Sequence, residues 1–156
     1  MAQLTETDKE NIKVIWDKVY PNAEESGRTI VIRLFVDYPQ TKSYFKNLTN
    51  ISTLEEMQQS AGIRAHGKRV MVALNKILEN LNDWAVVTDA LSRLAKRHED
   101  VHRVEAYNFE LLFLVIMNVF SDALGTDFTA EHCSSWKKLF SIVYDYLCSC
   151  YSNSAP

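Results

Sequence analysis

The sequence predicts an all-α fold of seven or eight helices, and three observations support this prediction. The 156 residues include only 4 Gly and 3 Pro, too few turn residues for a fold of many short strands. Apolar residues recur at steps of three and four along most of the chain, which is the spacing of amphipathic helices. Apolar residues make up 47% of the chain and charged residues 24%, the balance of a globular domain with a sizeable core. We therefore expect one domain over 1–156, with a core at about 4–151 and a short flexible C-terminal tail.

Start and stop signals divide the chain into helices. Thr5 and Asp8 have the spacing of a capping box, so the first helix is expected to begin there and to stop at Pro21. Gly125 is expected to end the most apolar helix, because glycine readily adopts the left-handed conformation found after a helix C-terminus. The other predicted elements are helices at 23–37, 60–81, 87–98, 105–124 and from 129 onward, short helical turns at 39–45 and after 53, and a loop at 46–52.

Charge and composition argue against several classes of partner. A net charge of −3 gives no basic surface of the kind that binds nucleic acid. The N-terminus lacks the segments of a secretory signal, and the longest apolar run, 111–117, is far shorter than a membrane span. Three cysteines, Cys133, Cys148 and Cys150, do not form the pattern of a disulfide framework. We expect a cytoplasmic protein in a reducing compartment, with no nucleic-acid partner and no membrane span.

Two histidines lie on the apolar faces of different predicted helices. His66 belongs to the helix at 60–81 and His98 to the helix at 87–98. A buried imidazole needs partners for its nitrogens or costs roughly 1–3 kcal/mol, so one such histidine alone would indicate a hydrogen-bonded core residue. Two that face inward from separate helices favour a bound metal or haem, because imidazole is a common metal ligand and the usual axial ligand of haem iron.

Residues 98–102 also match the H-E-x-x-H pattern of zinc peptidases. In that class two histidines one turn apart bind zinc while the glutamate activates water. The extended form of the pattern has Gly and His where this chain has Glu105 and Asn108. A distant third ligand, Glu110 or Glu131, keeps the alternative open, although no strand is predicted that would bind a peptide substrate.

Taken in order along the whole chain, these motifs resemble the globin family. The resemblance extends from about residue 4 to 151, and the stretches 69–71, 73–75 and 79–81 look most like vertebrate intracellular globins of the cytoglobin group. It rests on Trp16, Arg33, Leu34, Phe35, Tyr38, Pro39, Phe45, His66, Gly67, Leu94, His98, Val104, Asn108, Phe109 and Tyr151. It implies a globin fold around a haem pocket, haem b as the cofactor, and O2, with NO and CO, as ligands.

The resemblance also implies roles for individual residues. His98 corresponds to the proximal iron ligand, and its second nitrogen is expected to donate to the carbonyl of Leu94 one turn earlier. His66 corresponds to the distal histidine, which either stabilises a bound gas or serves as a sixth iron ligand; both roles remain open. The residues expected to contact the cofactor are Phe45, His66, Val70, Leu94, His98, His102, Val104 and Phe109.

Two glycines inside predicted helices fit a further feature of the family. Gly27 and Gly67 each cost roughly 0.5–1 kcal/mol relative to alanine in a helix interior, so their presence needs a reason. In globins the second helix crosses the long distal helix closely, and small residues allow the two backbones to approach. The resemblance therefore implies that the helices at 23–37 and 60–81 cross at these glycines.

The chain departs from the family pattern at several positions. Ala65 stands where many members have a Lys or Arg that pairs with a haem propionate, so we expect that contact from Arg64, Lys68, His102 or water. Val31 stands where Leu or Phe often covers the distal site, which leaves more room beside the iron. The cysteine pair of cytoglobins is not matched, so disulfide control is not carried over to this chain.

Two classes of function fit this interpretation. The first is a globin that reversibly binds O2 for storage, transport or sensing. The second is a haem enzyme with NO dioxygenase or peroxidase-like activity. The second needs an external reductant, such as a reductase, because the sequence contains no G-x-G-x-x-G nucleotide-binding motif. The missing motif favours the gas-binding class, and no catalytic residue is assigned.

Overall fold

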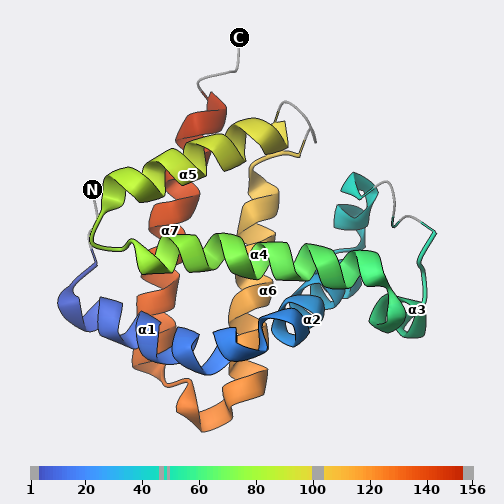
Figure 1. Cartoon of the computed structure of the whole chain (residues 1–156), viewed down its shortest axis with the longest axis horizontal. Helices are drawn as coiled ribbons and strands as arrows, with labels where there is room; N and C mark the ends of the chain where they lie inside the picture. The colour runs from blue at the N-terminus through green and yellow to red at the C-terminus, as the bar shows by residue number, and fades with distance from the viewer. Residues whose placement is uncertain (1–3, 46–47, 49, 100–103, 153–156) are drawn as a thin grey trace.

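The computed structural model describes residues 4–45, 48, 50–99 and 104–152. Within these residues the chain forms α-helices joined by short connections and contains no strand, which confirms the predicted fold class (Figure 1). The helices are α1 (Glu6–Val19), α2 (Ala23–Asp37), α3 (Leu54–Gln59), α4 (Ala61–Glu79), α5 (Trp84–Arg97), α6 (Tyr107–Leu124) and α7 (Ala130–Ser152). The short 3-10 segments are η1 (Tyr20–Asn22), η2 (Pro39–Tyr44) and η5 (Gly125–Asp127). The end of the predicted C-terminal tail, 153–156, lies outside the described residues.

Helix boundaries follow the capping signals of the sequence. At the start of α1, Thr5 Oγ1 accepts the backbone N–H of Asp8 at 3.0 Å, and the Asp8 carboxylate accepts the N–H of Thr5 at 2.9 Å. Thr53 and Glu56 form the same reciprocal arrangement at the start of α3. Gly125 follows the last residue of α6 with a φ of 53°, in the left-handed region that glycine adopts without strain. The predicted capping box at Thr5 and the predicted stop at Gly125 are both confirmed.

Helix α6 begins two residues later than the sequence predicts. The backbone N–H of Asn108 donates to the Glu105 carbonyl at 3.1 Å, and that of Phe109 donates to the Ala106 carbonyl at 3.0 Å. These are the short-range bonds of a turn rather than those of an α-helix, and no side chain caps the helix at Ala106. The predicted start at 105 is therefore a turn that leads into the helix.

Backbone contact between α2 and α4 confirms the glycine prediction. A Cβ atom built on Gly27 would lie 2.3 Å from the carbonyl oxygen of Gly67. A Cβ atom built on Gly67 would lie 2.3 Å from the carbonyl carbon of Gly27. No side chain larger than hydrogen fits at either position without moving one helix away from the other, so the two glycines fix how α4 crosses α2.

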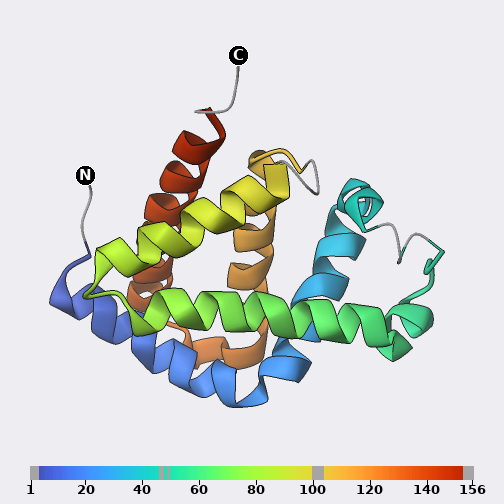
Figure 2. The same cartoon turned by 45° about the horizontal axis from the view of Figure 1, so that its top comes forward.

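Helices α6 and α7 run antiparallel to each other behind α4, and the main core lies between these helices (Figures 1 and 2). The rings of Phe113 on α6 and Phe140 on α7 stack with centroids 4.4 Å apart. Trp136 is fully buried, and its ring lies 5.0 Å from Phe120 and 6.1 Å from Trp16 on α1. Aromatic packing thus fixes α6, α7 and α1 relative to one another.

Helix α6 is apolar on nearly all sides. The segment Tyr107–Asp127 is long and apolar enough to cross a membrane by length and composition, with a mean hydropathy of 1.5, and 39% of it is buried inside the structure. The core helix of a water-exposed domain passes the same test. The prediction of no membrane span therefore cannot rest on run length alone, and it stays a prediction.

Candidate functional site

Helices α4 and α5 diverge from the short turn that joins them (Figures 1 and 2). His66 on α4 and His98 just after α5 are each about 14 residues from that turn. At 1.5 Å per residue, each histidine lies about 21 Å along its helix from the turn. The two imidazoles are therefore carried near the diverging ends of two helices.

The imidazole of His98 is held in one tautomer. Its Nδ1 lies 2.8 Å from the carbonyl oxygen of Leu94, one turn earlier on α5. Because a carbonyl oxygen only accepts, Nδ1 carries the proton of the neutral ring, and Nε2 carries the lone pair that binds a metal. The backbone N–H of Val104 donates to the His98 carbonyl at 2.9 Å, and the His98 ring packs 5.1 Å from that of Phe109. Leu94, Val104 and Phe109 thus each contact His98, and their predicted contact with the cofactor stays a prediction.

The His66 side of the site is aromatic and apolar. The ring of Phe45 meets the His66 imidazole edge-on, with centroids 4.6 Å apart and planes at 73°. Phe45 in turn packs on Phe35, whose ring centroid is 5.1 Å away. Val31 is buried in the same cluster and is 1% exposed. The second group of predicted site residues, Phe45 and His66, is therefore also brought together.

Half-buried side chains distinguish this region from the core. The buried residues of α4 are Ile63, Gly67, Met71, Leu74 and Ile77. His66, which is predicted on the apolar face of its helix, and Val70, which is predicted to contact the cofactor, are half-buried, whereas Met71 is buried in the core. The difference arises because residues 66 and 70 precede 67 and 71 by one position, or about 100° around the helix.

The same pattern recurs on the His98 side. Leu94 and Val104 are half-buried apolar side chains, while Ala95 is buried in the main core. A half-buried apolar row on each side of two imidazoles fits a flat apolar group with a metal at its centre, because that group would complete the burial of both rows. The residues present therefore fit haem.

Arg64 is not directed toward this site. Its guanidinium pairs with the Glu24 carboxylate of α2 at 3.4 Å between Nε and Oε1. The expectation that Arg64 binds a propionate is thus not supported, because its side chain bridges α4 to α2. Lys68 is exposed on α4. His102 lies outside the described residues, so its predicted propionate contact stays a prediction.

The zinc-peptidase alternative finds no support in the described part of the chain. No group of three or more His, Cys, Asp or Glu side chains there is arranged to bind a metal ion. Glu110 and Glu131, the candidate third ligands, belong to α6 and α7. The second histidine of the motif, His102, lies outside the described residues.

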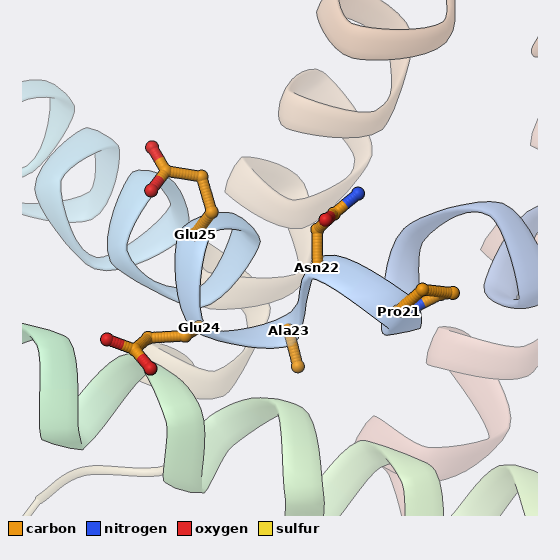
Figure 3. A pocket seen from close by; sticks show the side chains of 5 residues that line it. All are labelled: Pro21, Asn22, Ala23, Glu24 and Glu25. Atoms are coloured by element: carbon orange, nitrogen blue, oxygen red, sulfur yellow. The ribbon is translucent and has the colours of Figure 1, made fainter.

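A separate surface depression lies at the corner between α1 and α2 (Figure 3). It has a volume of about 270 Å³ and is lined by Pro21, Asn22, Ala23, Glu24 and Glu25. Glu24 lies beside α4, where it pairs with Arg64, whereas Glu25 points away from that helix. All the lining residues come from one short segment and none is an imidazole or thiol, so this depression does not have the composition of a cofactor site.

One polar contact near the site was not assigned a role by the sequence analysis. The buried Asn108 side chain donates from Nδ2 to the Glu105 carbonyl at 3.0 Å and to the Tyr44 hydroxyl at 3.4 Å. This contact joins η2, which leads to Phe45, to the start of α6, which carries Phe109. The sequence feature that could have indicated this contact is an asparagine in the first turn of an otherwise apolar helix, because a buried amide needs a hydrogen-bond partner.

Tyr151 packs behind the His98 side. Its ring meets that of Phe109 edge-on at 6.2 Å. Burial, followed by the charges of Glu99, Cys148 and Tyr44, raises the pKa of the Tyr151 phenol above its ordinary value. The phenol therefore stays neutral, and it supports Phe109 as an uncharged packing residue.

Together, the all-α fold and the two histidines on diverging helices define the class of haem-binding helical proteins. The chain belongs to the globin family, whose model matches residues 28–147. It is 36% identical to "Cytoglobin-2" of Danio rerio over 149 residues, which cover 96% of this chain and 83% of that protein. It is 37% identical to "Cytoglobin-1" of Oryzias latipes over 139 residues, which cover 88% of this chain and 78% of that protein. The predicted relation to cytoglobin is thus confirmed, and family membership implies a haem cofactor and diatomic gas ligands.

Proposed function

We propose that this protein reversibly binds O2, and also NO and CO, at the iron of haem b, for oxygen storage, transport or sensing. The observation that carries the proposal is the 2.8 Å bond between His98 Nδ1 and the Leu94 carbonyl. This bond leaves Nε2 as the ligating nitrogen, on a helix that diverges from the one bearing His66. When bound, haem supplies a ferrous iron that takes up a diatomic gas.

Different residues are expected to act on the α5 side and on the α4 side of the haem. His98 would hold the iron from the α5 side, with its ring kept in one orientation by the Leu94 carbonyl. Leu94, Val104 and Phe109 would exclude water from that face by packing. On the α4 side His66 would donate a hydrogen bond to the gas or take its place as a ligand, and Phe45 and Val70 would border the space beside it. A hydrogen bond to a polarised group contributes roughly 1.5–3 kcal/mol, or about ten- to a hundredfold in affinity.

An absorption spectrum of the purified protein, before and after reduction with dithionite, tests this proposal. We expect a Soret band in both states, which shifts when CO or O2 is added to the reduced protein. The visible bands of the reduced form distinguish His66 as a sixth iron ligand from His66 as a hydrogen-bond donor. A protein that stays helical but neither contains nor takes up haem would contradict the proposal.

The gas-binding role is preferred over a haem enzyme because the sequence carries no nucleotide-binding motif for its own reductant. The two roles differ in turnover. A storage or transport protein releases O2 unchanged, whereas an NO dioxygenase consumes it and must be reduced again after each cycle. Many cycles per minute with NO and an added reductase would reassign the protein to the enzymatic class.

We further propose that the chain is a single globin domain over 1–156 that acts in the cytoplasm, with neither a nucleic-acid partner nor a membrane span. The net charge of −3 and the three free cysteines support this setting. Propionate contact by His102 or Lys68 belongs to the same proposal. Loss of haem retention in a His102→Ala variant at low ionic strength would support the His102 contact.

A further inference from the structure

Helix α5 is supported more by α7 than by α4. It begins after the short turn that follows α4 and then diverges from that helix, whereas its contact with α7 is more extensive (Figures 1 and 2). Its buried residues, Val87, Leu91 and Ala95, form one row at steps of four. Apolar contacts have no preferred direction, so they fix the rotation of a helix less sharply than hydrogen bonds do. A directional contact with α7 would therefore determine how α5, and the His98 that follows it, is oriented.

Ser92 provides such a contact through its hydroxyl group. The residue is half-buried on α5, and its Oγ lies 2.8 Å from the carbonyl oxygen of Thr88, one turn earlier on the same helix. Ser92 Oγ also lies 2.9 Å from the hydroxyl oxygen of Tyr146 and 3.9 Å from the thiol sulfur of Cys150. Both of these residues belong to α7, so one hydroxyl group connects the two helices.

The three neighbours of this hydroxyl determine the direction of each hydrogen bond. A serine hydroxyl has one proton and two acceptor lone pairs, and a carbonyl oxygen only accepts. Ser92 therefore donates its proton to Thr88 and accepts from the Tyr146 phenol and the Cys150 thiol. Because Tyr146 and Cys150 are one turn apart on α7, they hold Ser92 from two successive turns of that helix.

The bonds of Ser92 lie on the side of α5 away from the candidate site. Ser92 and Leu94 are two positions apart, which places their side chains on nearly opposite sides of the helix. Ser92 precedes His98 by six residues, or about 9 Å along the axis. The His98 ring is joined to the Leu94 carbonyl at 2.8 Å, so a rotation of α5 against α7 would carry the carbonyl and the ring together.

We propose that Ser92 and Tyr146 are positioning residues, which set the rotation of α5 and thereby the direction in which His98 Nε2 points. This inference rests on the proposed function, in which His98 binds haem iron. The effect of Ser92 on the iron passes through the helix, because its side chain is directed to α7. A role within α5 alone does not account for a serine here. Alanine is the better helix former, and the bond from a serine to the carbonyl four residues earlier slightly destabilises a helix.

Resonance Raman spectroscopy of the reduced, haem-loaded protein measures the stretching band of the bond between iron and His98. His66→Ala serves as the background, because it removes the other imidazole. We expect Ser92→Ala and Tyr146→Phe each to shift or broaden this band. The double variant should resemble the single ones, because either change breaks the same bond. Thr88→Val is the matched control, since the Thr88 hydroxyl donates to the Ala85 carbonyl of the same helix, and it should leave the band in place.

Amide hydrogen exchange of the haem-free protein tests the contact without the cofactor. We expect exchange in α5 to accelerate about two- to tenfold in Ser92→Ala and in Tyr146→Phe, which is the effect of losing one hydrogen bond. The double variant should exchange no faster than the single ones, and Thr88→Val should exchange like the wild type. Circular dichroism checks that each variant is folded.

An iron–histidine band that stays in place in both single variants would overturn the proposal, even if α5 exchanges faster. Ser92 and Tyr146 would then contribute to stability alone. Additive effects in the double variant, or an equal shift in Thr88→Val, would also overturn it. A wild-type protein that binds no haem would contradict the proposed function and this inference together, whereas an unchanged band in a haem-loaded protein contradicts this inference alone.

Discussion

Helix α4 packs tightly against α2 but diverges from α5. Against α2 the two backbones touch at Gly27 and Gly67, with no space for a methyl group. From α5 it diverges (Figure 1), and the side chains of His66 and Val70 on α4 are only half-buried. Protein atoms alone complete the packing in the first contact, whereas the half-buried side chains of the second region would be covered by the haem that membership of the globin family implies. The first contact holds α4 in place, and the second uses that fixed helix to present His66.

The largest effect is expected from a methyl group at the tight crossing. In a Gly67→Ala variant the new Cβ would lie 2.3 Å from the Gly27 carbonyl carbon, and backbone atoms cannot yield as a side chain can. We expect a loss of at least about 4 kcal/mol in the free energy of unfolding, or failure to fold. Urea denaturation followed by circular dichroism measures this loss.

Gly62→Ala is the matched control on the same helix. The nearest atom to its Cβ would be Cδ2 of Leu48, at 2.7 Å, which is the end of a flexible side chain, and the next would be Ser60 Oγ at 3.6 Å. The gain in helix propensity offsets part of that contact, so we expect a change within about 1 kcal/mol. Equal stabilities of the two variants would show that the α2–α4 crossing is not as close as described.

Removal of haem should affect the two regions unequally. We expect amide hydrogen exchange to accelerate at least about tenfold in α5 and at 104–109, because these segments lose the group that completes their burial. The α2–α4 crossing should change much less, since its contacts are between backbones. Exchange measured by mass spectrometry on the haem-loaded and haem-free protein gives this comparison. Uniform acceleration across both regions would contradict the distinction between them.

A smaller effect is expected at a contact remote from both regions. The Asp8 carboxylate accepts from Lys138 Nζ at 2.7 Å, from the Thr5 N–H at 2.9 Å and from Ser135 Oγ at 2.9 Å. These bonds, that from Lys138 first, hold the pKa of Asp8 well below its usual value of 3.8. Because the folded-state pKa is lowered, the stabilisation is present above about pH 4 and is lost as pH falls toward the folded value.

Asp8→Asn should therefore lower the free energy of unfolding by about 1–2 kcal/mol at pH 7 and reduce its dependence on pH below 4. Asp17→Asn, an exposed position on the same helix, is the control and should be close to neutral. Urea denaturation at pH 7 and pH 3 provides the measurement. Parallel loss of stability in wild type and Asp8→Asn on acidification would contradict the assignment.

Much of the fold could be predicted because its signals are local. Thr5, Thr53 and Gly125 mark helix ends through bonds or dihedral angles within a few residues. The start of α7 shows the limit of this approach. There His132 Nδ1 accepts the N–H of Thr129 at 3.1 Å, in a capping position where Glu or Gln is usual, so a search for the standard pair misses it.

The sequence indicated which residues belong to the candidate site, but not how deeply each is buried or which side chains they contact. The spacing on each helix indicated His66 and His98, and the family resemblance indicated the apolar residues near them. Which residue of a pair one position apart faces the core depends on how the helices are rotated in the fold, so the sequence did not indicate that Met71 is buried while Val70 is half-buried. The Arg64–Glu24 pair joins residues 40 positions apart, and no local pattern specifies it.

The central claim is that His98 binds haem iron and that His66 lies on the opposite face. Hemin titration of the haem-free wild type, His98→Ala and His66→Ala, followed by Soret absorbance, tests it most directly. We predict that His98→Ala loses haem or binds it at least about a hundredfold more weakly, whereas His66→Ala retains haem and releases O2 or CO at a changed rate. Full haem retention by His98→Ala together with loss by His66→Ala would contradict the account.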